Sequence, residues 1–251
     1  MKRILVTNDD GVRSEGIHAL ALALQQLGEV TVVGPQTEAS AIGHALTLRR
    51  PLRMELLGER VYEVDGTPTD CVNIAVTQLY KPGGAMPDLV VSGINKGYNL
   101  GDDVTYSGTV AGALEAALLG IPGIAVSLER SLDTYDFRAA ASAAAQVAAL
   151  VLPQGLAPRT FLNVNVPGGE PKGMRATFQA KRNHVTVVDV RIDPRNKPYY
   201  WIEEGEDAWE PHDRSDYQAV KDGYVSVTPL QPDLTAYDEL AALQALLSLE
   251  P

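Results

Sequence analysis

Short runs of β-branched residues alternate with helical segments through most of the first two-thirds of the chain. The pattern opens with a strand-like run at residues 3–7, a helical segment at about 14–27 and a second strand-like run at 30–33. Such alternation is typical of βαβ units, in which helices cover both faces of a parallel sheet. The sequence therefore predicts an α/β fold, a Rossmann-like three-layer domain with a mostly parallel sheet. Further helices are expected near 68–80, 109–119 and 137–152, and further strands at 89–92, 123–127 and 161–166.

One departure from this alternation lies early in the chain. Between Pro35 and Val64 a long polar loop precedes two strand candidates, at residues 52–57 and 61–64. Because the two candidates are separated by a short turn, we expect them to form a hairpin.

A second departure begins after Pro167, where the helical periodicity gives way to strand-like pieces separated by Pro, Gly and acidic turns. We expect these pieces to form an extended β arm, followed by a terminal amphipathic helix that serves packing or a subunit contact. Residues 1–166 are thus the predicted core, and residues 167–251 the predicted β-rich arm and C-terminal helix of the same unit. The strand candidates of the arm are 185–192, 199–202 and 225–228, and the helix candidate is 235–249.

Composition narrows the classes of protein that the chain can belong to. Met1, Lys2 and Arg3 run directly into the first strand, with no apolar segment long enough for a signal peptide or a membrane span. Cys71 is the single cysteine, which rules out an intrachain disulfide and favours a cytoplasmic location. A formal net charge of −11 argues against binding a nucleic-acid polymer, whose phosphates require a basic surface.

Two adjacent carboxylates, Asp9 and Asp10, follow the first predicted strand and precede Gly11. In open α/β sheets the carboxyl ends of the strands form the crevice where ligands bind. Neighbouring carboxylates repel each other, whereas a hard divalent cation accepts both as oxygen ligands. The alternative is a polar turn in which Asn8 or Asp9 caps the next helix and Gly11 relieves backbone strain.

Two further loops follow predicted strands and offer neutral oxygen ligands that would complete a metal site. The first contains Ser40 and the second contains Asn95, which lies between Gly93 and Gly97. Lys96, beside Asn95, is a candidate contact for an anion. Considered singly, Ser40 is equally an ordinary loop hydroxyl and Asn95 a turn residue.

The stretch Ser107, Gly108, Thr109 opens a strongly helical, alanine-rich segment. Free N–H groups and the positive end of the helix dipole make such a start a phosphate site, to which both hydroxyls could add donors. The alternative is a plain Ser or Thr N-cap. The histidines are scattered without the spacing of zinc ligands, and His44 is the one near the candidate site. The chain also lacks the sequence patterns of the P-loop, the dinucleotide-binding loop, the zinc metalloproteases and the nucleophile elbow.

Several ordered motifs resemble the SurE family of survival proteins, which act as nucleotidases. The similarity covers nearly the whole chain. It is carried by 4–11 (ILVTNDDG), 40–47 (SAIGHALT), 66–72 (GTPTDCV), 92–99 (SGINKGYN), 106–113 (YSGTVAGA) and 223–230 (GYVSVTPL). The sequence departs from the family pattern at Ala45, where a hydroxyl residue is common, and at Ser215, which replaces the Thr of a Thr-Asp pair.

The resemblance implies a Mg²⁺ or Mn²⁺ ion, one per subunit, bound by Asp9, Asp10, Ser40 and Asn95. It also implies hydrolysis of nucleoside 5′- or 3′-monophosphates, with activity on short polyphosphate in some members. Family members assemble as homodimers or homotetramers by exchanging C-terminal β arms and a terminal helix.

From these observations we expect a metal-dependent phosphatase whose catalytic residues are Asp9, Asp10 and Asn95. The expected contacts to phosphate or substrate are Asn8, His44, Lys96, Ser107, Gly108 and Thr109. The main alternative is a nucleotide-binding or sensing module that uses the same pocket without turnover. A phosphatase that forms an aspartyl-phosphate, or a protein whose β arm serves assembly, is a further alternative.

Overall fold

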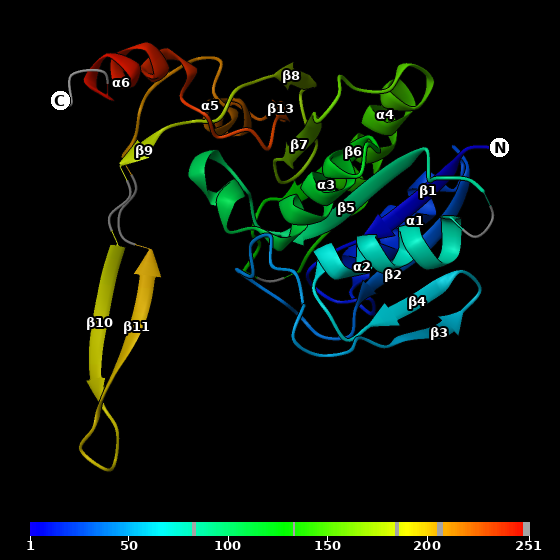
Figure 1. The fold of residues 1–251 in the computed structure, drawn as a ribbon, viewed down its shortest axis with the longest axis horizontal. Helices are drawn as coiled ribbons and strands as arrows, with labels where there is room; N and C mark the ends of the chain where they lie inside the picture. The colour runs from blue at the N-terminus through cyan, green and yellow to red at the C-terminus, as the bar shows by residue number, and fades with distance from the viewer. Residues whose placement is uncertain (82–83, 133, 184–185, 205–207, 248–251) are drawn as a thin grey trace.

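The computed structural model describes residues 1–81, 84–132, 134–183, 186–204 and 208–247. Within these residues nine strands form one mixed sheet in the order β3-β4-β2-β1-β5-β6-β7-β13-β8 (Figure 1). The strands are β1 Arg3–Thr7, β2 Glu29–Pro35, β3 Met54–Gly58, β4 Val61–Val64, β5 Leu89–Lys96, β6 Gly123–Leu128, β7 Phe161–Val166, β8 Met174–Ala176 and β13 Val225–Leu230.

The centre of this sheet is parallel, as the sequence predicts. β1 pairs in parallel with β2 and β5, and β5 and β7 pair in parallel with β6 between them. The predicted hairpin is also confirmed, because β3 pairs antiparallel with β4 at the edge of the sheet.

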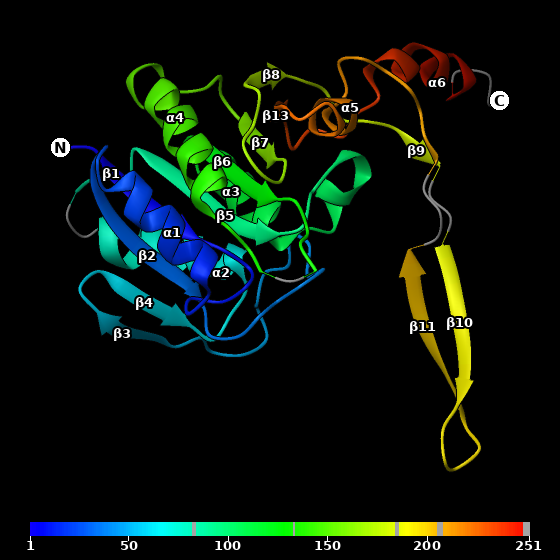
Figure 2. The ribbon, with the colours of Figure 1, turned by 180° about the vertical axis from the view of Figure 1, so that it is seen from behind.

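Helices cover both faces of the sheet, in the three-layer arrangement that the alternation predicts (Figures 1 and 2). Alternate residues of β1 point to opposite faces. Ile4 and Val6 belong to the core beneath α1 and α4, whereas Leu5 belongs to the core beneath α2. The helices are α1 Glu15–Leu24, α2 Pro68–Ile74, which continues as a π-helix over Ala75–Tyr80, α3 Gly108–Leu118 and α4 Arg138–Gln154.

A long hairpin projects from this body (Figure 2). Its strands, β10 Thr186–Ile192 and β11 Pro198–Glu204, pair antiparallel, and β9 Arg182–Asn183 pairs with β12 Ala208–Trp209 at its base. Apolar side chains of the hairpin are exposed on both strands, Val188 by 50%, Trp201 by 55% and Ile202 by 79%. The predicted β arm is therefore present; Val185, at the start of its predicted first strand, lies outside the described residues.

The assignment of residues 225–228 to the arm is wrong. They belong to β13, which pairs antiparallel with β7 and in parallel with β8 inside the main sheet. Sequence periodicity identifies a strand but not its partner, and the partner here precedes β13 by about sixty residues in the chain. A short helix that the sequence analysis did not predict, α5 Asp216–Lys221, precedes β13. The division of the chain at residue 166 remains a prediction.

The predicted terminal helix appears as a 3-10 turn, Tyr237–Glu239, followed by α6 Leu240–Leu247. The rest of the predicted helix, residues 248 and 249, lies outside the described residues. None of the α6 residues is buried, so the described part of the chain does not cover the apolar face that was expected to pack. No helix in the described part of the chain has the length and apolarity needed to cross a membrane.

Close packing of α1 on β5 depends on Gly16. A Cβ built on Gly16 would overlap the carbonyl oxygen of Ile94 and would approach Cε1 of Phe137 to 3.2 Å. The missing side chain lets the first turn of α1 lie directly on the end of β5. The position of Asn95, the next residue of β5, is therefore coupled to this contact.

We predict that Gly16→Ala lowers the free energy of unfolding by about 1–3 kcal/mol, the usual cost of overpacking a fixed site. Helix propensity alone would predict the opposite sign, a gain of up to about 1 kcal/mol. Denaturant unfolding measures the difference. Gly58→Ala is the matched control, because a Cβ there meets nothing within 4 Å. A Gly16→Ala protein as stable as the parent would contradict the packing argument.

Candidate active site

The candidate site lies where three parallel strands end. Asp9 and Asp10 follow β1, the loop that follows β2 contains Ser40, and Asn95 lies near the end of β5. Because β2, β1 and β5 are consecutive parallel strands of the sheet, their carboxyl ends meet at one edge. A hydrogen bond of 2.8 Å from the Ala39 N–H to the carbonyl of Asp9 also ties the Ser40 loop to β1.

Asp9 lies against the first turn of α3. Its carboxylate accepts a hydrogen bond from the Thr109 hydroxyl, and the side chain is 6% exposed. A Cβ built on Gly108 would lie 2.8 Å from Asp9 Cβ and 3.0 Å from Asp9 Oδ2, so glycine is needed for this approach. Burial raises the pKa of Asp9, and hydrogen bonds from the side chain and backbone of Thr109 only partly oppose the shift.

Asp10 is half-buried, and burial together with the charge of Asp9 raises its pKa to about 6. The positive charge of Lys96 opposes the shift but does not cancel it. Within the described residues, Asp10 Oδ2 is buried and has no hydrogen-bond partner. A buried carboxylate oxygen with no donor fits a cation at this position, because a hard divalent ion would supply the missing positive charge.

The two neutral candidate ligands differ in how firmly they are held. Asn95 is half-buried, and its Nδ2 donates to the carbonyl of Gly97 at 3.0 Å, which leaves Oδ1 as the free end of the amide. Ser40 is exposed, and its hydroxyl donates to Glu38 at 2.5 Å. Among the described residues, no group of three or more His, Cys, Asp or Glu residues has metal-binding geometry, so a metal at this position would need neutral oxygen ligands beside the two carboxylates.

Glu38 was not identified from the sequence. Its negative charge contributes to the raised pKa of both Asp9 and Asp10, so it adds to the negative charge around the site. An isolated glutamate in a polar loop gives no sequence signal, since charged loop residues are common. Only the folded loop brings it to the aspartates.

Ser107 and Thr109 are both engaged by the protein itself. Ser107 Oγ accepts from the N–H of Val110 at 3.1 Å, so Ser107 is the N-cap of α3, as the simpler alternative predicts. Thr109 donates hydrogen bonds to Asp9 from both its hydroxyl and its backbone N–H. The Ser107 hydroxyl proton and the N–H of Gly108 remain the donors at this helix start that could meet a phosphate.

Asn8 does not reach the surface of the site. It is fully buried, and its Nδ2 donates to the carbonyl of Gly11 at 3.0 Å and to Ser14 Oγ at 2.8 Å. Ser14 is in turn the N-cap of α1. Asn8 therefore holds the turn that carries the two aspartates, and its placement gives no support to the predicted substrate contact.

Lys96 and His44 lie at the margins of the site. Lys96 is exposed at the end of β5, with Nζ 5.7 Å from the centre of the Tyr135 ring. His44 Nε2 lies 2.7 Å from a carboxylate oxygen of Glu115 on α3, and the other oxygen of Glu115 accepts from Asn73 at 2.7 Å. These hydrogen bonds fix the imidazole against α3.

A buried asparagine network supports the loop after β5 and was also missed from the sequence. The N–H of Asn99 donates to Asn165 Oδ1 at 2.8 Å, and Asn163 Nδ2 donates to the carbonyl of Asn99 at 2.8 Å. Asn163 and Asn165 alternate with apolar residues on β7, so their side chains share one face. The signal in the sequence is two asparagines on one face of a buried strand, a pattern that predicts hydrogen bonds to a neighbouring loop.

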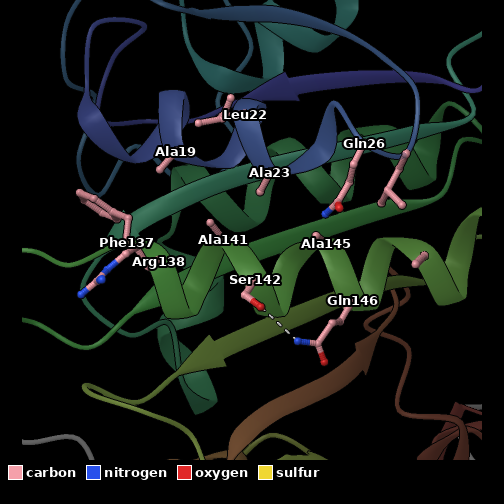
Figure 3. Close-up of a pocket in the computed structure, with 12 residues that line it drawn as sticks. Ala19, Leu22, Ala23, Gln26, Phe137, Arg138, Ala141, Ser142, Ala145 and Gln146 are labelled. Atoms are coloured by element: carbon pink, nitrogen blue, oxygen red, sulfur yellow. Dashed lines mark hydrogen bonds between the residues drawn. The ribbon is translucent and has the colours of Figure 1, made fainter.

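A surface groove lies away from this site. A hollow of about 640 Å³ runs between α1 and α4 and is lined by small side chains such as Ala23, Ala141 and Ala145 (Figure 3). On the α4 side, Gln146 donates to Ser142, one turn earlier in the same helix, at 3.2 Å. The lining of this groove has no cluster of titratable groups. We therefore take the carboxyl ends of β2, β1 and β5, and not this groove, as the candidate active site.

Comparison with known proteins agrees with this fold. The chain superposes on the crystal structure of the SurE protein from Aquifex aeolicus with a TM-score of 0.86 and 44% sequence identity. The superposition covers 98% of this chain and 99% of that one.

Sequence relatives point to the same family. The chain is 52% identical over 251 residues to 5′-nucleotidase SurE 1 of Thermus thermophilus, with 98% of each chain covered. It is 51% identical over 245 residues to 5′-nucleotidase SurE of Geotalea daltonii, with 96% of this chain and 98% of the relative covered. Residues 4–186 match the family described as survival protein SurE. The chain therefore belongs to the SurE family.

Proposed function

We propose that this protein is a phosphatase that hydrolyses nucleoside 5′-monophosphates with the help of a divalent cation. The observation that carries the proposal is the buried carboxylate pair, in which Asp10 Oδ2 has no hydrogen-bond partner within the described residues. Relatives with about half of their residues identical over nearly the full length are named 5′-nucleotidases. We assign Asp9, Asp10, Ser40 and Asn95 as the residues that hold one Mg²⁺ or Mn²⁺ ion per subunit.

When bound, such an ion would polarise a phosphoryl oxygen and favour attack by water. The protein contributes positioning and charge. The N–H of Gly108, the hydroxyl of Ser107 and the ammonium group of Lys96 would hold the phosphate in line for attack. Asp9 or Asp10 would accept the proton of the attacking water, since both carboxylates lie at the proposed metal position.

The finer features of the function are also proposals. Nucleoside 3′-monophosphates and short polyphosphate present the same terminal phosphoryl group, so both are candidate substrates of the same site. The exposed apolar side chains of the β10–β11 hairpin and of α6 support assembly as a homodimer or homotetramer through exchange of these elements.

A phosphate-release assay with AMP and either Mg²⁺ or Mn²⁺ tests the reaction, and Asp9→Asn tests the site. We predict at least a roughly 100-fold loss of kcat/KM, because the change removes one ligand charge while keeping the side-chain size. Asp238→Asn, at an exposed position, is the control and should retain full activity. Nucleotide binding without phosphate release by the parent protein would instead support a non-catalytic sensing module.

Thr109 is predicted to act through Asp9. Thr109→Val removes the hydroxyl that donates to the Asp9 carboxylate, and loss of such a supporting hydrogen bond costs roughly 10- to 100-fold in metal affinity. Thr109→Ser keeps the hydroxyl and should bind metal nearly as well as the parent. Calorimetric titration with Mn²⁺ measures the affinities directly. Equal affinities of the Val and Ser variants would show that the hydroxyl does not support the site.

The raised pKa of Asp10 predicts a pH dependence of stability in the presence of a chelator. A carboxyl whose pKa is higher in the folded chain contributes stability that is present below about pH 4 and is lost as pH rises through about 6. Asp10→Asn removes this loss, so at pH 8 the variant should be more stable than the parent by roughly 1–2 kcal/mol, after allowance for solvent screening. Denaturant unfolding between pH 4 and pH 8 measures the difference.

Added Mn²⁺ should reverse the order of stability. At pH 7.5 the ion should raise the Tm of the parent protein but not that of Asp10→Asn, because binding to the folded state stabilises it by mass action. If the parent and the variant had the same pH dependence with chelator and the same Tm shift with Mn²⁺, Asp10 would not be a ligand.

A further inference from the structure

An exposed aromatic residue stands directly beside the proposed phosphate position. Tyr106 precedes Ser107, the N-cap of α3, and its side chain is 63% exposed. Consecutive Cα atoms are about 3.8 Å apart, so the Cα of Tyr106 lies within about 8 Å of the Cα of Gly108. Its ring makes no contact with another aromatic ring or a cation within the described residues.

The backbone of Tyr106 is nevertheless fixed on both sides. Its N–H donates to the carbonyl of Asp103 at 3.0 Å, and its carbonyl accepts from the N–H of Gly43 at 2.8 Å. The backbone that carries the ring is thus held in place while the side chain stays exposed. An exposed aromatic ring on a fixed backbone can accept a flat ligand without the cost of ordering the loop.

An apolar side chain lies close to the same place. Ile42 is 39% exposed, and a Cβ built on Gly108 would lie 3.0 Å from Ile42 Cγ2. Ile42 therefore lies over the first turn of α3, next to the phosphate position. Single exposed apolar residues are common on protein surfaces, but here Tyr106 and Ile42 border the same proposed site.

His44 adds a fixed polar group on the same loop. Its Nε2 is committed to Glu115 at 2.7 Å, and Glu115 is itself held by Asn73. Nδ1 is the nitrogen left for an outside partner, since no other hydrogen bond of His44 occurs within the described residues. The imidazole is one-third exposed, so a ligand hydroxyl can reach it.

We infer that these residues form a nucleoside subsite, in which the nucleobase stacks on the Tyr106 ring beside Ile42 and His44 Nδ1 hydrogen-bonds a ribose hydroxyl. The inference rests on the proposed nucleotidase function and extends it to recognition of the substrate. Stacking on an aromatic ring accepts every base, because each base has a π-face. The subsite therefore distinguishes a nucleotide from a plain sugar phosphate, and discriminates weakly between nucleobases.

Steady-state kinetics with AMP, UMP and ribose 5-phosphate test the stacking role, with Mn²⁺ present throughout. We expect Tyr106→Ala to raise KM for AMP and UMP roughly tenfold, within the range measured for base–aromatic stacking. Its kcat and its kinetics with ribose 5-phosphate should match the parent, since that substrate has no base. Tyr106→Phe keeps the ring and should behave as the parent. Tyr237→Ala, at a side chain of similar exposure (64%), is the control.

Inhibition by adenosine gives a second measurement that involves no turnover of the inhibitor. We expect Tyr106→Ala to weaken adenosine inhibition roughly tenfold while leaving inhibition by inorganic phosphate unchanged. His44→Ala should weaken adenosine inhibition as well, and should raise KM for AMP and ribose 5-phosphate alike.

Two results would overturn the subsite. One is a parent protein that hydrolyses ribose 5-phosphate with the same KM as AMP; the other is a Tyr106→Ala protein with unchanged KM for AMP and unchanged adenosine inhibition. A change in oligomeric state for Tyr106→Ala, with equal losses on all substrates, would show that the ring is a subunit contact instead. If the parent released phosphate from none of these esters, the proposed nucleotidase function itself would fail.

Discussion

Asp9 and Asp10 are adjacent carboxylates in a position with little solvent. The rest of the site depends on how their negative charge is offset. Burial raises both pKa values, and the charge of Asp9 raises that of Asp10 further. Thr109, the positive end of the α3 dipole and Lys96 offset part of this cost. The compensation is incomplete, because both pKa values stay raised and Asp10 Oδ2 has no donor. This shortage of positive charge is the physical basis for expecting a cation.

Backbone approaches that only glycine permits bring the site together. Gly108 lets α3 meet Asp9, and Gly16 lets α1 lie on the end of β5 beside Asn95. The buried network of Asn99, Asn163 and Asn165 then holds the loop after β5 from the other side. The positions of the proposed ligands are therefore set by buried contacts of the core, and Ser40, in an exposed loop, is the exception.

Sequence patterns predicted local structure and failed where distant segments meet. The order of strands and helices around Asp9, Asp10 and Asn95 follows from periodicity, because hydrophobic alternation reports burial along each element. The place of residues 225–228 in the main sheet does not, because pairing with β7 depends on tertiary packing. Asn8 remains a predicted substrate contact; the structure buries it and pairs its Nδ2 with Gly11 and Ser14, a local arrangement that periodicity does not report.

The acidic character of the whole chain bears on which phosphates such a site can take. At a net charge of −11 the long-range field repels anions, but salt screens it beyond roughly 8 Å under physiological conditions. Attraction must therefore come from groups within a few ångströms of the phosphate, namely the start of α3, Lys96 and a bound cation. A small monoester presents its charge only there. A nucleic-acid polymer would place its other phosphates against an acidic surface. The net negative charge therefore disfavours binding of the polymer but still allows binding of a mononucleotide.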